Sequence, residues 1–173
     1  MVLAAAFAEG TANDWMAVAF VDGHRIDKAL GVVALAVFLT FMTAGRILGT
    51  GLLDRYGRGP ILRILFAASI LGCLLVVFGN VWLAFVGVAV WGVGASLGFP
   101  VGMSAAADDP RRAALRLSVV TTIGYTAFLA GPPLLGFLGD HFGILNALLV
   151  VGAVSVLALL VVPAAKPLPA DDP

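Results

Sequence analysis

Charged side chains are scarce in this sequence. Of its 173 residues, 12% are Asp, Glu, Lys or Arg and 61% are hydrophobic, whereas soluble domains carry about 25% charged residues. Most of the molecular surface must therefore face an apolar medium, and a lipid bilayer is the simplest such partner. Ten basic residues are balanced by ten acidic ones, so no basic field indicates binding to nucleic acid.

Cysteine and histidine are almost absent. The single cysteine, Cys73, excludes an internal disulfide. With two histidines, His24 and His141, the sequence has no His/Cys cluster that suits a metal, and we expect neither a metal nor a cofactor.

One pattern is typical of an enzyme. Residues 94–98 read Gly-Ala-Ser-Leu-Gly, which matches a hydrolase nucleophile elbow. That elbow requires a strand-to-helix turn with a histidine base in reach. Here the run is predicted inside an apolar helix, and both histidines are predicted in loops. We therefore expect no catalytic residues and no enzyme.

Long hydrophobic runs fill most of the chain. A membrane-spanning helix needs about 20 mostly apolar residues, and six such runs lie at roughly 2–21, 29–53, 60–79, 81–104, 114–138 and 144–163. Backbone in lipid must satisfy its own hydrogen bonds, so all six are predicted to be helices of an all-α integral membrane protein. Pro100 and the pair Pro132 and Pro133 remove backbone donors and are predicted to bend their helices.

Basic residues are distributed unevenly between the two sides of the predicted bundle. Six spans place both termini on one side, and that side receives eight of the ten basic residues. Because basic loops stay inside, we expect both termini in the cytoplasm. The tail, 166–173, has three prolines and two acids and is predicted to be a disordered cytoplasmic end. The eight residues are Arg46, Arg55, Arg58, Arg63, Arg111, Arg112, Arg116 and Lys166, against Arg25 and Lys28.

A short internal repeat divides the chain in two. Residues 54–57 read Asp-Arg-Tyr-Gly, and residues 140–143 read Asp-His-Phe-Gly. Each ends the middle helix of a predicted triplet, on opposite faces of the membrane. This indicates an inverted three-plus-three repeat, with units 1–80 and 81–165. Loops favour Asp and Gly in general, so chance is the alternative.

The most specific motif covers residues 45–58, which read Gly-Arg-Ile-Leu-Gly-Thr-Gly-Leu-Leu-Asp-Arg-Tyr-Gly-Arg. Gly57 allows a tight turn, and Asp54 can face the positive N-terminal end of a neighbouring helix. Arg55 and Arg58 are expected to keep this loop in the cytoplasm. The segment resembles the cytoplasmic loop signature of the major facilitator superfamily, in which D-R-x-G-R links two helices.

Two positions depart from that signature. Thr50 stands where the family often has Gly, and Gly59 stands where it often has another basic residue. Three other stretches, 8–15, 91–100 and 124–136, strengthen the resemblance. Together they look like helices seven, eight, ten and eleven of a twelve-helix transporter from a bacterial branch related to sugar permeases.

The resemblance implies a fold and a function. The chain would be the C-terminal half of the fold, helices seven to twelve, with the first six helices absent from the sequence. It would sit in the bacterial inner membrane and transport a small solute, sugar-like or drug-like, by alternating access. Because the site of this fold lies between two halves, the partner would be an N-terminal half or, if the chain is complete, a second copy.

Polar residues inside the predicted spans are the candidate substrate or proton site. A charge at the bilayer centre costs roughly 3 kcal/mol or more, yet Glu9, Asn13 and Asp14 share the first span. Glu9 and Asn13 lie on one helix face. The set is completed by Arg46 in the second span and Tyr125 in the fifth. The alternative is that these residues lie near headgroups or are paired inside the bundle.

Depth along the helices predicts one contact. Glu9 and Arg46 each lie about eight residues from the same end of adjacent antiparallel helices, roughly 12 Å deep at 1.5 Å per residue. Each is the nearest opposite charge to the other, so we predict an ion pair, direct or through one water. Protonation of Glu9 would release Arg46, which gives a route for proton coupling.

A different class of function is left open by the sequence. A six-helix membrane protein that transports nothing and serves as an assembly or regulatory subunit would show the same composition. The identity of a substrate, the direction of transport and the oligomeric state are not encoded in any motif found.

Overall fold

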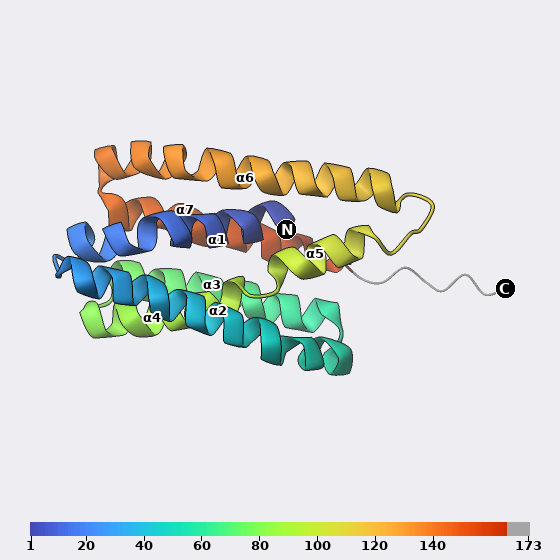
Figure 1. Cartoon of the computed structure of the whole chain (residues 1–173), viewed down its shortest axis with the longest axis horizontal. Coiled ribbons are helices and arrows are strands. Elements are labelled where there is room, and N and C mark those ends of the chain that lie inside the picture. Colours follow the sequence, from blue (N-terminus) through green and yellow to red (C-terminus); the bar gives the residue numbers. More distant parts are fainter. Residues whose placement is uncertain (166–173) are drawn as a thin grey trace.

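The computed structural model describes residues 1–165 and is helical throughout that part of the chain (Figure 1). The predicted tail at 166–173 lies outside the described residues. The elements in chain order are α1 (Val2–Val18), the π-helix η1 (Ala19–Gly23), α2 (Lys28–Tyr56), α3 (Arg58–Phe78), α4 (Val81–Ala95), α5 (Gly98–Ala106), α6 (Ala113–Phe142), α7 (Ile144–Val161) and the 3₁₀-helix η2 (Val162–Ala165).

Five segments of the described chain are long and apolar enough to cross a membrane: Lys28–Tyr56, Arg58–Phe78, Val81–Ala106, Ala113–Phe142 and Ile144–Ala164. They confirm a multi-pass membrane protein and correspond to the second to sixth predicted spans. The first predicted span, 2–21, is not among them. It forms the 17-residue helix α1 and then changes to the π-helix η1.

Two turns of a single residue connect long helices. Gly57 alone separates α2 from α3, and Gly143 alone separates α6 from α7. Both have positive φ angles, 78° and 82°, which side chains other than glycine rarely adopt. The sequence places glycine at both points, so each pair of helices folds back sharply as a tight antiparallel hairpin.

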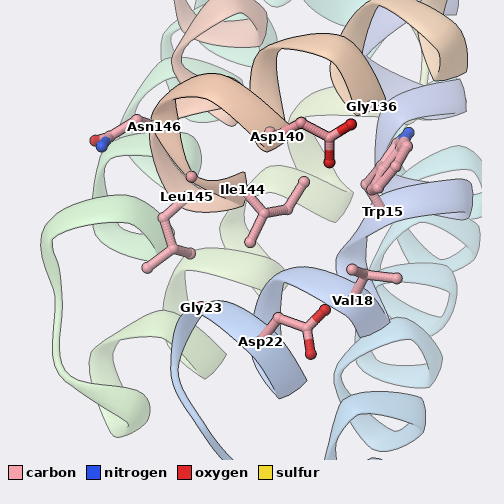
Figure 2. A pocket seen from close by; sticks show the side chains of 11 residues that line it. Trp15, Val18, Asp22, Gly23, Gly136, Asp140, Ile144, Leu145 and Asn146 are labelled. Carbon is pink, nitrogen blue, oxygen red and sulfur yellow. The ribbon is translucent and has the colours of Figure 1, made fainter.

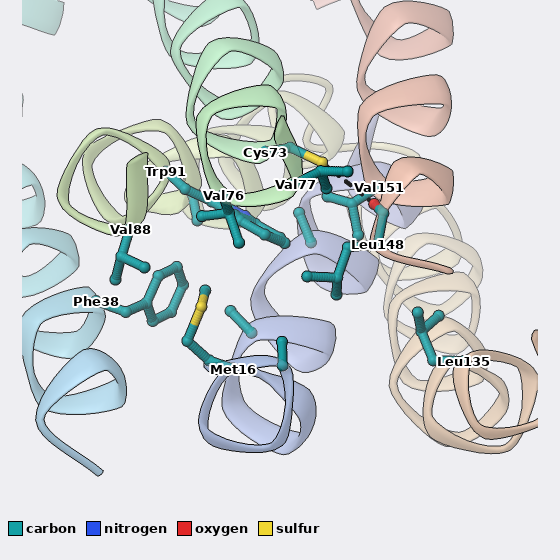
Figure 3. Packing of buried hydrophobic residues seen from close by; sticks show 14 of the residues in the cluster. Met16, Phe38, Cys73, Val76, Val77, Val88, Trp91, Leu135, Leu148 and Val151 are labelled. Atoms are coloured by element: carbon teal, nitrogen blue, oxygen red, sulfur yellow. Dashed lines mark hydrogen bonds between the residues drawn. The ribbon is translucent and has the colours of Figure 1, made fainter. Parts of the chain in front are cut away.

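The helices pack unequally. α3 and α4 are the most closely packed pair, with α7 against α3 and α2 against α4, while α6 packs mainly against α1. Figure 1 shows α6 along one edge of the bundle. The main core lies between α1, α2, α3, α4 and α7, where Phe38 meets Trp91 edge to face at 6.4 Å (Figure 3). In the same core the Cys73 thiol donates to the carbonyl of Leu148 at 3.2 Å.

The loops gather at two ends, as the predicted topology requires. The Gly57 turn and the 107–112 loop lie at one end, with the 24–27 link and Gly143 at the other (Figure 1). An ion pair between Arg58 and Asp108 ties the first two loops together. We call these the basic end and the acidic end, because Asp22 and Asp140 line one cavity at the latter.

One predicted span is broken. The run 81–104 was expected to be a single helix, but α4 ends at Ala95 and α5 begins at Gly98. The interruption lies at Ser96 and Leu97, one turn before Pro100, the proline expected to bend this span. In contrast, α6 continues unbroken through Pro132 and Pro133.

Candidate functional site

The predicted ion pair between α1 and α2 is present. Arg46 Nη2 donates to Glu9 Oε1 at 2.8 Å. The Glu9 side chain is 14% exposed and that of Arg46 is 40% exposed, so the pair lies at the edge of the bundle with its cation partly open. Since both residues lie within the apolar part of their helices, the pairing removes the cost of leaving either charge alone in hydrocarbon.

Arg46 has a second partner that the sequence analysis missed. Its Nε donates to the carbonyl oxygen of Ser96 at 3.0 Å, at the interruption between α4 and α5. Pro100 has no backbone N–H and cannot supply the helical hydrogen bond that this carbonyl would accept four residues earlier. The sequence could have identified Ser96, because the carbonyl four residues before a proline inside a helix lacks its usual donor.

Two glycines of α2 permit this close approach. A Cβ added to Gly45 would lie 2.8 Å from Ser96 Cβ, and one added to Gly49 would lie 2.5 Å from Leu97 Cδ1. Both glycines therefore face the interruption between α4 and α5, where the side chains of Ser96 and Leu97 pack against them. Gly45 and Gly49 are spaced by four, a pattern that indicates close helix packing in membranes. Here the close packing brings the guanidinium of Arg46 within reach of Ser96.

The other intramembrane candidates are less enclosed. Asn13 and Asp14 are exposed on α1, one turn beyond Glu9. Tyr125 on α6 is 63% exposed and has no hydrogen-bond partner within residues 1–165. The structure thus brings Glu9 and Arg46 into contact, whereas Asn13, Asp14 and Tyr125 stand on exposed surface of the bundle. A site that includes them stays a prediction.

The loop motif lies at the basic end. Asp54 and Arg55 are exposed in the last turn of α2, and the Arg55 guanidinium stacks over the Tyr56 ring at 5.3 Å. Gly57 makes the turn. Within the described chain Asp54 has no hydrogen-bond or ion-pair partner, and its role opposite a helix end stays a prediction.

Arg58, the last residue of the motif, forms a clamp. It pairs with Asp108, and its Nη2 donates to the hydroxyl of Ser104 at 3.0 Å. A longer contact of 3.6 Å joins Asp109 to Arg116 at the start of α6. Arg58 was predicted as part of the loop, but its partners Ser104 and Asp108, which lie 46 and 50 residues further along the chain, were not.

A cavity of about 480 Å³ opens at the acidic end between α1, η1, α6 and α7. Figure 2 shows Trp15, Asp22 and Asp140 around it. None of the predicted site residues lines this cavity.

The pattern at 94–98 does not form a hydrolase elbow. Ser96 is fully buried at the interruption after α4, and its hydroxyl donates to the carbonyl of Val93 at 2.6 Å. His24 bonds the Val76 carbonyl instead, at 2.8 Å. Among residues 1–165, no group of three or more His, Cys, Asp or Glu side chains could hold a metal.

Known proteins resemble nearly the whole chain. The family model described as Major Facilitator Superfamily matches residues 2–173. An uncharacterized MFS-type transporter of Yersinia pestis is 32% identical over 161 residues, which cover 92% of this chain and 41% of the relative.

Two rhizobial relatives show the same coverage. An uncharacterized transporter of Sinorhizobium fredii is 30% identical over 171 residues, covering 96% of this chain and 45% of the relative. Membrane protein MosC of Rhizobium meliloti is 26% identical over 151 residues, covering 86% and 37%. The chain therefore spans less than half the length of these relatives. No solved structure gives a significant match.

Proposed function

The chain belongs to the Major Facilitator Superfamily, and from this premise we propose that it forms one half of a proton-coupled secondary transporter for a small solute. The transported solute is sugar-like or drug-like, and alternating access moves it across the bacterial inner membrane. The relatives support transport in general, since two of them are named as transporters.

The half in question is the C-terminal one, helices seven to twelve of the sugar-permease-like branch. The limited coverage of each relative and the motif-bearing turn at Gly57 support this reading. The missing contribution comes from an N-terminal half or a second copy. Asp54, exposed and without a partner in residues 1–165, is available to face a helix end of that other half.

The fold of this half is proposed to be an inverted three-plus-three repeat of six spans, with α1 and η1 as the first. Two observations support it. Gly57 and Gly143 have nearly equal φ angles and end the middle helices at opposite ends of the bundle. In addition, α2 packs against α4 while α6 packs against α1, so each middle helix contacts the first helix of the other triplet.

The ion pair between Glu9 and Arg46 is the observation that carries proton coupling. It holds a carboxylate and a guanidinium at 2.8 Å inside an apolar helix pair, where such groups are costly and occur mainly at functional sites. Protonation of Glu9 frees the cation, which is already 40% exposed, to bind a hydroxyl or anionic group of the solute. Asp14 is the second candidate for the proton.

Transport by the completed protein tests this function. The transporter, reconstituted in liposomes that contain a pH-sensitive dye, is exposed to a panel of sugars and drug-like solutes. A solute that is carried should drive proton entry, and Glu9→Gln should abolish that entry while Glu9→Asp retains part of it. Asp27→Asn, an exposed residue before α2, is the matched control. Unchanged solute-driven proton entry in Glu9→Gln would refute the coupling role.

Orientation is tested separately. In a Cys73→Ser background, cysteines at Tyr56 and Asp27 mark the basic end and the acidic end. We expect an impermeant thiol reagent to label the Asp27 position from the periplasm and the Tyr56 position only after the membrane is opened, because basic loops stay in the cytoplasm. Labelling of both from the same side contradicts the topology.

A further inference from the structure

The interruption between α4 and α5 is the one place where a predicted membrane span of the described chain opens. Ser96 N bonds the Val93 carbonyl at 3.1 Å, a three-residue step that tightens the end of α4. α5 then restarts with a bond from Val101 N to the Leu97 carbonyl at 3.0 Å. Between these two bonds, the Ser96 carbonyl has no backbone donor, because residue 100 is proline.

Burial makes this carbonyl costly. Ser96 is 0% exposed, so neither water nor lipid headgroups can reach it. A buried peptide group without a hydrogen bond costs several kcal/mol in hydrocarbon. The protein must supply a donor, and Arg46 Nε does so at 3.0 Å. Gly45 and Gly49 remove the side chains that would otherwise keep α2 away from this point.

The same guanidinium also bonds α1. Its Nη2 bonds Glu9 on α1 at 2.8 Å, so one planar group connects α1, α2 and the opening in the fourth span. The two bonds use different nitrogens of one rigid fork. A change at Glu9 therefore moves the donor on which the Ser96 carbonyl depends.

We propose that Arg46 is a positioning residue that replaces the missing N–H of Pro100 and thereby sets the angle between α4 and α5. Glu9 keeps the guanidinium in place, and loss of the Glu9 contact lets the α4–α5 segment change its bend. The link between Arg46 and the bend stands on the geometry alone. Its use in transport rests on the proposed function, where the bend would respond to the state of the coupling carboxylate.

The prolines of α6 provide the contrast. Pro132 and Pro133 leave the carbonyls of Phe128 and Leu129 without helical donors, yet α6 is continuous there. Leu129 is 77% exposed, so its surroundings differ from those of buried Ser96. No side chain of residues 1–165 donates to either carbonyl. Of these two proline-containing segments within residues 1–165, only the fourth span therefore has a side chain that replaces the missing proline N–H.

A double-mutant cycle with a distance readout tests the proposal. In a Cys73→Ser background, which keeps a donor for Leu148, spin labels are placed at Trp82 and Ala107, both exposed and at the outer ends of α4 and α5. Pulsed dipolar spectroscopy then measures the label-to-label distance in lipid nanodiscs. The wild-type pair should give one narrow distribution.

Arg46→Met should broaden or shift this distribution. It should also destabilise the protein and lower the ratio of folded to unfolded protein by about tenfold, the order expected for loss of a charged hydrogen-bond donor. Pro100→Ala restores an N–H at an exposed position. In that background the distance distribution should be narrow with either residue at position 46. The loss of stability caused by Arg46→Met should be smaller than with proline at position 100, and the remainder comes from Glu9, which is unpaired in both backgrounds. Arg46→Lys keeps a charge for Glu9 but has no Nε–H. If Arg46→Met fails to fold, Arg46→Lys is measured in its place, and it should show the same change in the distance distribution.

Pro133→Ala is the control, since the carbonyl that Pro133 leaves without a donor, that of Leu129, has no contact with Arg46. Three results would each overturn the proposal: a narrow distance distribution restored to Arg46→Met by Pro133→Ala, an unchanged distance in Arg46→Met, or an equal effect of Arg46→Met on the distance with Ala at position 100. Proton entry is measured on the same variants. Distances that follow the cycle while Glu9→Gln transports normally would retain the positioning role and reject the coupling function.

Discussion

The α4–α5 segment and α6 both carry proline inside an apolar segment, yet they differ in almost every other respect. α4 is packed on several sides, with Ala84, Val88 and Trp91 fully buried. α6 buries four positions in 30 residues, Gly124, Ala127, Gly131 and Leu135. The first segment opens at its proline-dependent carbonyl and the second does not.

The difference teaches that proline alone does not decide whether a membrane helix opens. What matters is where the freed carbonyl lies and which donor is near it. In the fourth span the carbonyl is enclosed and a guanidinium reaches it. In α6 one of the two freed carbonyls belongs to Leu129, which is exposed, and the helix stays continuous there.

The largest expected effect comes from the backbone contacts of α4. A Cβ at Gly94 would lie 2.5 Å from the Ser69 nitrogen and 2.7 Å from the Leu65 carbonyl. Backbone cannot yield as a side chain can, so Gly94→Ala should cost about 3 kcal/mol. Gly136→Ala on α6 meets Trp15 at 3.4 Å and should be nearly neutral. Unfolding of both variants in mixed detergent micelles measures the difference, and equal costs would remove the contrast.

Removal of a proline should affect the stability of the two segments unequally. Pro133→Ala returns a hydrogen bond to the interior of α6 and should stabilise the protein by about 1–2 kcal/mol, less than the full propensity difference. Pro100 lies in the first turn of α5, where proline is tolerated, so Pro100→Ala should change the stability little. A larger gain at position 100 than at 133, measured by the same unfolding assay, contradicts this account.

Removal of the two acidic side chains in the 107–112 loop, which joins α5 to α6, should lower the stability by different amounts. Asp108→Asn removes the partner of Arg58 and should cost about 1 kcal/mol, because the pair is only a fifth to a quarter exposed. Asp109→Asn removes the 3.6 Å contact with Arg116 on the α6 side and should cost below about 0.5 kcal/mol. Unfolding measured at low and high salt checks both, and a larger cost at Asp109 would reverse the ranking.

The smallest effect on stability is expected on the open face of α6. Tyr125 is 63% exposed, so Tyr125→Phe should change the free energy of unfolding by less than about 0.5 kcal/mol. Under the proposed function the same change should weaken solute binding in the completed transporter. Leu129→Ala, at a similarly exposed position of α6, is the control for binding. Equal solute affinity in Tyr125→Phe and the parent would remove Tyr125 from the site.

Apolar run length was enough to place most helices. The runs at 29–53, 60–79, 114–138 and 144–163 correspond to α2, α3, α6 and α7, because backbone in hydrocarbon has no alternative to a helix. The π-helix after Val18 was missed, since a change of hydrogen-bond step leaves no pattern in hydrophobicity. The opening at Ser96 was predicted only as a bend at Pro100, because a proline acts on the carbonyl one turn upstream.

The candidate site was predictable where depth and charge fixed it. Glu9 and Arg46 occupy equal depths on neighbouring helices, and opposite charges in hydrocarbon have few other partners, so their contact followed from the sequence. The Ser96 carbonyl was not predictable, because every residue has a carbonyl and only tertiary packing brings one to Arg46. Likewise, Asp108 could not be matched to Arg58 without knowing which loops meet.

The turns at Gly57 and Gly143 limit how the length of this chain can vary during evolution. An added residue would rotate the following helix by about 100°, turning the buried side of α3 or α7 toward lipid. Neither turn has a spare residue that could absorb such a shift. The 107–112 loop can lengthen without turning a packed helix. Insertions and deletions among homologues should therefore accumulate in that loop and leave both glycine turns constant in length.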